Sequence, residues 1–293
     1  MADHMAEDGA EDETEEQTNM KLPVWRTAKA AYLVIVHNPG LAVKLCAVPF
    51  ALTIIQGLVT AWLWGGQDLA AFTQNGPAQA AVFGMSAVVY LSMVPTITAW
   101  HRLALIGHGV PDARIHYSIR SSEWLYLWKG FLFVLLMTLI SIPALVAGGS
   151  LGGIIGAAFQ GGPRHSGAGI LIAILAVLAV QAFLCACVLR FNLVFPAAAI
   201  GDTMGFRESW RRTRGNTWRL FGVAVLTVAP FLLIPTVLVL MVFGFKRLPT
   251  VTEQALVGLL HAPFWIIGLC VGISFWSWSY RYLVQEAEID LPS

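Results

Sequence analysis

Three arginines have the residue type and the spacing to form an anion-binding site. Arg102, Arg190 and Arg281 each end a long apolar run, and they are separated by 88 and 91 residues. A guanidinium group binds a phosphate through two parallel hydrogen bonds. If the apolar runs pack around one axis, the three side chains form a ring that would bind an anionic headgroup or solute. The alternative is that each arginine extends to its nearest phospholipid and only marks the edge of the membrane.

Further basic residues are interleaved with tryptophans and predict an interfacial face. Residues 206–221 hold five arginines and two tryptophans between two long apolar runs. Such a mixture beside a membrane-length segment is typical of a lipid headgroup layer. We therefore predict a basic-aromatic face on the cytoplasmic side. Its residues are Trp25, Arg26, Trp124, Lys129, Arg207, Trp210, Arg211, Arg212, Arg214, Trp218 and Arg219.

Catalytic and metal-binding patterns are absent from the sequence. It contains no GxSxG, HExxH or P-loop pattern, and no GxGxxG followed by an acidic residue. His101, His108 and Asp112 lack the spacing of a triad or metal site, and a histidine beside Arg102 is expected at the surface. The four cysteines lie in apolar runs without metal-ligand spacing and are expected as small buried side chains. We expect no catalytic residue, no metal and no cofactor.

The composition indicates an integral membrane protein. Of the 293 residues, 57% are hydrophobic and 12% are charged, against about a quarter charged in soluble domains. Eight of the 17 acidic residues lie in the first 16 positions, which leaves a basic excess in the rest of the chain. Because the basic clusters flank apolar runs, we expect them to meet anionic phospholipids and not nucleic acid.

Six apolar runs predict an all-α fold with six transmembrane helices in one domain, residues 20–285. Residues 1–19 are predicted as a disordered acidic tail, and residues 286–293 as a short acidic tail. The termini and the loops after spans two and four hold 14 Lys and Arg residues, which places both termini in the cytoplasm. The predicted spans are 41–64, 78–100, 127–148, 168–189, 220–244 and 256–280.

Regular spacing favours an internal repeat. Pro77, Pro163 and Pro249 each precede an even-numbered span and are separated by 86 and 86 residues. With the spacing of the three arginines, this predicts three helical hairpins in the same orientation, related by an axis along the membrane normal. The other interpretation is that any six-span protein places prolines and charges regularly in its loops.

Local patterns predict several further features. Residues 24–37 are expected as an interfacial amphipathic helix that residues 38–40 end. The Gly-rich residues 149–167 fit either a loop or a short helical re-entry. Gly201 and Gly205 are expected to form a tight turn in which Asp202 caps the following basic helix. Gln56 and Gln181, at mid-span depth, are expected to hydrogen-bond across helices.

Residues 195–221 resemble a recurring bacterial membrane pattern. A span ends in an arginine, and apolar residues with Pro and a Gly-Asp turn follow. A basic helix with Ser-Trp and then Asn-x-Trp precede the next span. This pattern is similar to the membrane domain attached to some glycerophosphodiester phosphodiesterases. The hydrophilic catalytic domain of those enzymes is missing, so the resemblance implies a bacterial inner-membrane helical bundle without assigned chemistry.

Two functions fit these observations. The first is a non-enzymatic scaffold or accessory subunit that acts through the basic-aromatic face, with a membrane protein or a second copy of the chain as its partner. The second is a small carrier or lipid-handling protein that binds an anionic headgroup or solute at the arginine ring. An enzyme that acts on lipid headgroups through His101 and His108 is the least favoured interpretation.

Overall fold

The computed structural model describes residues 20–64, 76–107, 121–159, 167–243 and 251–289. Every regular element within these residues is a helix, which confirms the predicted all-α class. The predicted tail 1–19 lies outside the described residues. The helices are α2 (Val24–His37), α3 (Pro39–Trp64), α5 (Gly76–Ile106), α6 (Ser121–Phe159), α7 (Gly167–Phe191), α8 (Val194–Ala199), α9 (Phe206–Arg212), α10 (Thr217–Phe243) and α11 (Val251–Leu283).

Five helical segments are long and apolar enough to cross a membrane. They are Pro39–Leu63, Gly76–Ile106, Ser121–Pro143, Ile174–Ala199 and Thr217–Met241. Each exceeds the roughly 20 helical residues that span a hydrocarbon core. These segments indicate a membrane protein and coincide with five of the six predicted spans.

The predicted sixth span falls on α11, which is 33 residues long but is not among these segments. Three serines in its C-terminal half, Ser274, Ser277 and Ser279, are fully buried. The Trp100 indole donates a 2.9 Å hydrogen bond to Ser274, and His101 Nδ1 lies 2.8 Å from the Ser277 hydroxyl. The prediction of a surface histidine was therefore wrong.

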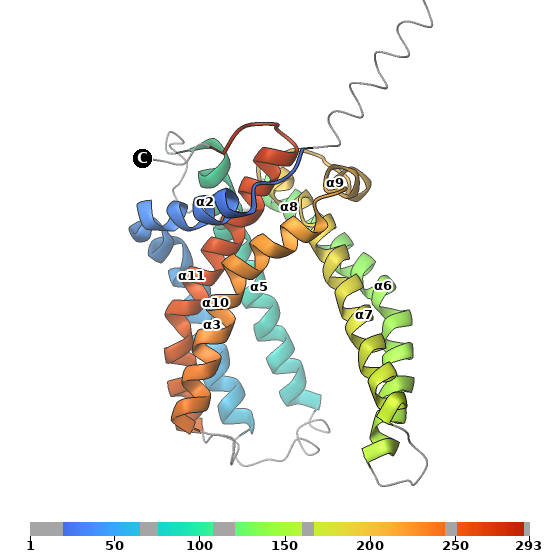
Figure 1. Cartoon of the computed structure of the whole chain (residues 1–293). Helices are drawn as coiled ribbons and strands as arrows, with labels where there is room; N and C mark the ends of the chain where they lie inside the picture. Colours follow the sequence, from blue (N-terminus) through green and yellow to red (C-terminus); the bar gives the residue numbers. More distant parts are fainter. Residues whose placement is uncertain (1–19, 65–75, 108–120, 160–166, 244–250, 290–293) are drawn as a thin grey trace, which may run out of the picture.

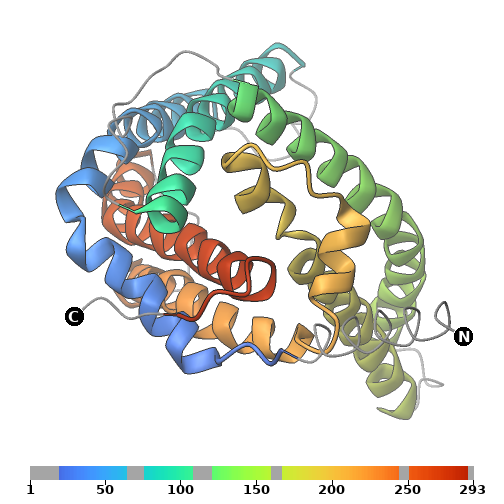
Figure 2. The ribbon, with the colours of Figure 1, turned by 90° about the horizontal axis from the view of Figure 1, so that it is seen from above.

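α11 packs against α2, α3, α5, α8 and α10 and lies in the middle of this group (Figure 2).

Helices that follow each other in the chain pack in pairs, α3 with α5, α6 with α7, and α10 with α11. Figure 1 shows α3, α5, α10 and α11 as one group, while α6 and α7 stand apart over most of their length. The α6–α7 pair meets the rest mainly through α8, α9 and the nearest ends of α5 and α10. All three short helices, α2, α8 and α9, lie at this same end of the molecule (Figure 1).

The predicted interfacial helix 24–37 is present as α2, which lies across the end of the bundle (Figure 1). Thr27, Ala28, Ala30 and Ala31 form its buried face. Their small side chains let α2 approach α10 and α11 closely. At its C-terminal end, the Asn38 side chain donates to the carbonyl of an earlier turn and α3 begins at the following proline.

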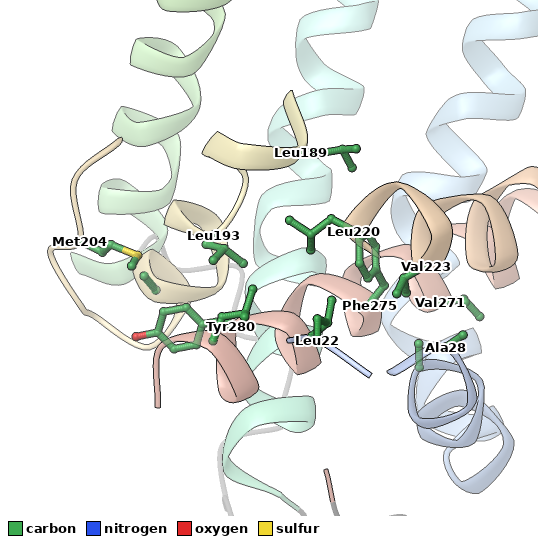
Figure 3. Packing of buried hydrophobic residues seen from close by; sticks show 13 residues of the cluster. Leu22, Ala28, Leu189, Leu193, Met204, Leu220, Val223, Val271, Phe275 and Tyr280 are labelled. Carbon is green, nitrogen blue, oxygen red and sulfur yellow. The ribbon is translucent and has the colours of Figure 1, made fainter. Parts of the chain in front are cut away.

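The largest apolar cluster also lies at this end and joins segments distant in the sequence. Figure 3 shows Leu22, Leu189, Leu193, Leu220 and Phe275 packed together; all five are buried. They come from the chain before α2, from α7, from the turn before α8, and from α10 and α11. This end, and not the middle of the membrane segments, therefore holds the main core of the fold.

The segment 20–22 is bound by side chains from 194 to 261 residues further along the chain. Asn216 Oδ1 accepts a 2.8 Å hydrogen bond from the Leu22 N–H, and Asn216 Nδ2 donates a 2.8 Å bond to the Met20 carbonyl. Arg219 donates to the Leu22 carbonyl at 3.0 Å, and the Tyr282 hydroxyl donates to the carbonyl of Lys21 at 3.4 Å. These bonds satisfy main-chain groups that no helix satisfies.

α10 and α11 lie close together at Gly268. A Cβ added there would lie 2.8 Å from the Cβ of Phe231, an atom that moves only with its backbone. We expect Gly268→Ala to separate the helices and to lower the free energy of unfolding by about 1–3 kcal/mol, as overpacking does. Unfolding in mixed detergent micelles measures the change. Gly272→Ala is the control, because its Cβ would meet Val228 at an ordinary 3.9 Å; equal losses in both variants would contradict the prediction.

Other local predictions had mixed outcomes. The Gly-rich residues 149–159 continue α6 as helix, so neither a loop nor a re-entry begins at residue 149, and residues 160–166 lie outside the described residues. Gln56 donates a 2.6 Å hydrogen bond to Ser86 on α5, as predicted. Gln181 instead has an exposed side chain on α7 with no hydrogen bond to the described residues, so its prediction was wrong. Cys46 and Cys270 are buried free thiols whose sulfur atoms lie 3.8 Å apart.

Candidate functional site

An open hollow of about 770 Å³ lies between the C-terminal end of α7 and α9. It is lined by Arg190, Gly205, Arg207, Glu208, Trp210, Arg211 and Arg214. Four arginines against one glutamate give this lining a net charge of +3. We call it the arginine hollow. All four arginines and the tryptophan belong to the residues that the sequence predicted for anion binding or for the interfacial face.

Short hydrogen bonds hold α9 against the end of α7. The Ser209 hydroxyl, fully buried, donates a 2.6 Å bond to the carbonyl of Arg190. This satisfies one of the carbonyls that the last turn of a helix leaves unpaired. In return, Arg190 donates a 2.6 Å bond to the Trp210 carbonyl and a 3.4 Å bond to the Thr213 hydroxyl. α9 has only seven residues, so these contacts rather than its own length hold it in place.

The Arg190 guanidinium also stacks on Trp210, with 3.7 Å between its central carbon and the ring centroid. Behind this pair lies an aromatic layer in which Phe191 is 5.0 Å from Trp210 and 5.9 Å from Phe206. Phe206 in turn stacks at 6.4 Å on Phe133 of α6. A cation over an indole face is attracted electrostatically. The position of Arg190 in the hollow is therefore fixed by stacking as well as by hydrogen bonds.

Glu208 balances part of the positive charge. Its carboxylate pairs with Arg211 at 2.6 Å and with Arg212 at 2.9 Å. Partial burial acts to raise the pKa of Glu208, but the hydrogen bonds from Arg212 and Arg211 outweigh it and hold this pKa below its ordinary value. A lowered pKa means that the ion pairs contribute stability at neutral pH and lose it only as the pH falls through that pKa. Arg212 also pairs with Glu286 at 3.1 Å, so it ties α9 to the segment after α11.

The turn before α9 differs in part from its prediction. Gly201 has a φ of +85°, a conformation that favours glycine. Asp202 was predicted to cap the basic helix, but that was wrong. Its carboxylate accepts a 3.2 Å bond from the Met204 N–H and a 2.7 Å bond from the Tyr280 hydroxyl. The residue before α9 is Gly205, whose φ of −89° needs no glycine.

The three span-ending arginines bind separate partners, and no hydrogen bond or ion pair among the described residues joins them. Arg102 donates a 2.7 Å bond to the Ala199 carbonyl and pairs with Glu123 at 3.4 Å. Arg281 lies over the ring of Trp278 at 5.1 Å. Only Arg190 lines the arginine hollow. The arginines therefore cluster at α9, where Arg190 lines the hollow together with Arg207, Arg211 and Arg214.

The predicted basic-aromatic face divides into exposed and structural residues. Trp25, Trp124 and Trp218 are 72%, 66% and 80% exposed. Lys129, in contrast, donates a 2.9 Å bond to the Met204 carbonyl. Arg219 donates to the Leu22 carbonyl before α2, and Arg212 pairs with both Glu208 and Glu286. Arg26, Arg207, Arg211 and Arg214 are exposed.

Two acidic residues of this end were not singled out from the sequence. Glu208 lies three residues before Arg211 and four residues before Arg212. This spacing predicts ion pairs on one face of a helix, so the role of Glu208 could have been predicted from the sequence. Glu123 lies in the first turn of α6, where it is buried and pairs with Arg102. No local sequence signal indicates that pairing. His108 and Asp112 lie outside the described residues.

Comparison with protein families, with curated proteins and with solved structures returned no match for this chain.

Proposed function

We propose that the chain is a six-span protein of a bacterial inner membrane with both termini in the cytoplasm. The five apolar segments support the membrane location, and the pairwise packing of α3–α5, α6–α7 and α10–α11 supports three helical hairpins. Their threefold parallel repeat rests on the spacing of prolines and arginines in the sequence alone. The excess of Lys and Arg in the loops beside α2, α8 and α9 supports a cytoplasmic position for that end. The bacterial inner membrane rests on the resemblance carried by residues 195–221.

We propose further that the protein is non-enzymatic and acts as a scaffold or accessory subunit through the basic-aromatic face. One observation carries this proposal: three strongly exposed tryptophans, Trp25, Trp124 and Trp218, share one end of the molecule with the exposed arginines. Trp218 is 80% exposed and directly follows the basic stretch that contains Arg207, Arg211 and Arg214. Tryptophan at a headgroup layer combines an apolar ring with a polar N–H, and is enriched where proteins bind one another. Anionic phospholipids would surround this face.

Native mass spectrometry of the tagged protein, released gently from its own membranes, tests the scaffold proposal. We expect one protein partner, or a second copy of the chain, at fixed stoichiometry. Trp218→Ala should reduce the bound fraction about tenfold or more, because exposed tryptophans that anchor an interface typically contribute 2 kcal/mol or more. The control is Trp62→Ala, since Trp62 is 75% exposed but lies near the far end of α3. A bare monomer, or equal losses in both variants, would argue against this function.

A carrier or lipid-handling protein is the second candidate. Its anion site would be the arginine hollow, since Arg102 and Arg281 bind other partners. The net charge of +3 in this hollow is the observation that favours it.

A further inference from the structure

We propose that the arginine hollow is a binding site for a single phosphate group, carried by a soluble molecule or by a lipid headgroup. Arg190, Arg207 and Arg214 would be its ligands. The inference rests on the proposed function in one respect, because a lipid phosphate reaches the hollow only if this end of the molecule faces the headgroup layer.

Arg190 provides a fixed donor at the hollow. Its stacking on Trp210 and its bonds to the Trp210 carbonyl and the Thr213 hydroxyl occupy Nε and one terminal nitrogen. A guanidinium has five N–H donors, so others remain for a ligand. Since the side chain is already ordered, a ligand that binds it does not have to restrict its rotamers. Preorganisation of this kind raises affinity.

The charge of the hollow is not balanced by the protein. Arg207 and Arg214 are exposed, and their guanidinium groups make no hydrogen bond or ion pair with the described part of the chain. The charge of Arg214 also acts unfavourably on Arg190. Arg211 alone is compensated within the hollow, by Glu208 at 2.6 Å. An anion between the uncompensated arginines would relieve their mutual repulsion.

Three other arginines at this end are already satisfied by protein groups, and Arg26 is exposed on α2, outside the hollow. Arg102 pairs with Glu123, Arg212 with two glutamates, and Arg219 with a main-chain carbonyl. Unpaired arginines around a concave surface are therefore a specific property of the hollow rather than of the whole end.

The size of the hollow favours a phosphate ester over bare phosphate. About 770 Å³ is within the range of small-molecule pockets and leaves room beside the phosphate. Phosphate also matches the chemistry of the lining, because several guanidinium groups can each donate to a different oxygen of the same group.

Two pocket variants and one matched control test the proposal. Arg207→Gln with Arg214→Gln removes two charges from the hollow. Gly205→Phe keeps every charge but fills the space, since a Cβ on Gly205 meets no atom within 4 Å and its backbone accepts any side chain. Arg26→Gln with Lys29→Gln removes two charges from exposed positions of α2 instead. Each variant is first checked for a single symmetric elution peak and an unchanged melting temperature in an uncharged detergent.

Binding is measured with two probes: inorganic phosphate by titration calorimetry, and phosphatidylglycerol against phosphatidylcholine by native mass spectrometry. We expect the wild-type protein to bind one equivalent of at least one probe. The double arginine variant should bind about 100-fold more weakly, with about tenfold for each charge-assisted hydrogen bond. Gly205→Phe should weaken binding by a similar factor, and the α2 control should bind as the wild type does. The probe that binds identifies the source of the phosphate, soluble or lipid.

Three outcomes would overturn the site. One is the absence of one-to-one binding with both probes. Another is unchanged binding in Gly205→Phe, which would place the anion outside the hollow. The third is an equal loss in the α2 control and in the double arginine variant, which would show diffuse attraction to the whole face. In the third case the proposed function of the face would survive while the site would not.

Discussion

Replacing Glu123 by alanine is expected to lower the free energy of unfolding by about 3–4 kcal/mol, because it leaves a largely buried guanidinium without its carboxylate. The two side chains are only 20% and 6% exposed for Arg102 and Glu123. Arg102 also bonds to the Ala199 carbonyl and to the Ser122 hydroxyl, so the pair joins α5, α6 and the end of α8. Its loss should loosen the attachment of the α6–α7 pair to the other helices. Unfolding in mixed detergent micelles measures the change.

A double variant separates the unpaired charge from the loss of packing. Arg102→Met combined with Glu123→Gln removes both charges and keeps most of the volume, and replacing a buried pair in this way is often close to neutral. We therefore expect the double variant to be more stable than Glu123→Ala. If the double variant is instead as unstable as Glu123→Ala, the destabilisation does not come from an unpaired buried charge.

Replacing Asn216 by alanine is expected to cost about 2–4 kcal/mol, because two main-chain groups lose their partner in a buried site. The Leu22 N–H and the Met20 carbonyl each form a 2.8 Å bond with the Asn216 side chain. The Leu22 side chain, fully buried in the main cluster, would lose its anchor as well. We also expect protease cleavage before α2 to become faster.

A partial substitution and a control substitution test the Asn216 prediction further. Asn216→Asp keeps the acceptor for the Leu22 N–H but loses the donor to Met20, so about half of the destabilisation should remain. Lys21→Ala removes an exposed side chain from the same segment and should change stability by less than about 0.5 kcal/mol. Equal stability of Asn216→Ala and the wild type would show that the segment is held by Leu22 packing alone.

Hydrophobic runs and their flanking charges predicted most of the helical framework, because a membrane-length helix is a local property of the sequence. The interfacial helix 24–37 was found with the same bounds for a similar reason, since it alternates small, apolar and basic residues and ends at a proline. The helix α11 was predicted in the same way, but only the packed structure shows that other helices bury its serines.

The candidate site could be predicted only by residue type. Arg190, Arg207, Arg211 and Arg214 were all identified as basic residues of this end, but their grouping in one hollow depends on how α9 docks on α7. That docking uses the Ser209 hydroxyl and a main-chain carbonyl, which no charge or hydropathy pattern reveals. For the same reason, the similar spacing of Arg102, Arg190 and Arg281 suggested a ring, while the contacts of each arginine are set by its own neighbours.

The buried serines of α11 also bear on how the protein is made. A nascent segment enters the lipid in proportion to its own apolarity, and Ser274, Ser277 and Ser279 make the C-terminal half of α11 less apolar than α10. Ser274 and Ser277 are bonded to Trp100 and His101 of α5, which precedes α11 in synthesis. We therefore expect the insertion of α11 to depend on helices that were synthesised before it and that can bond to its serines.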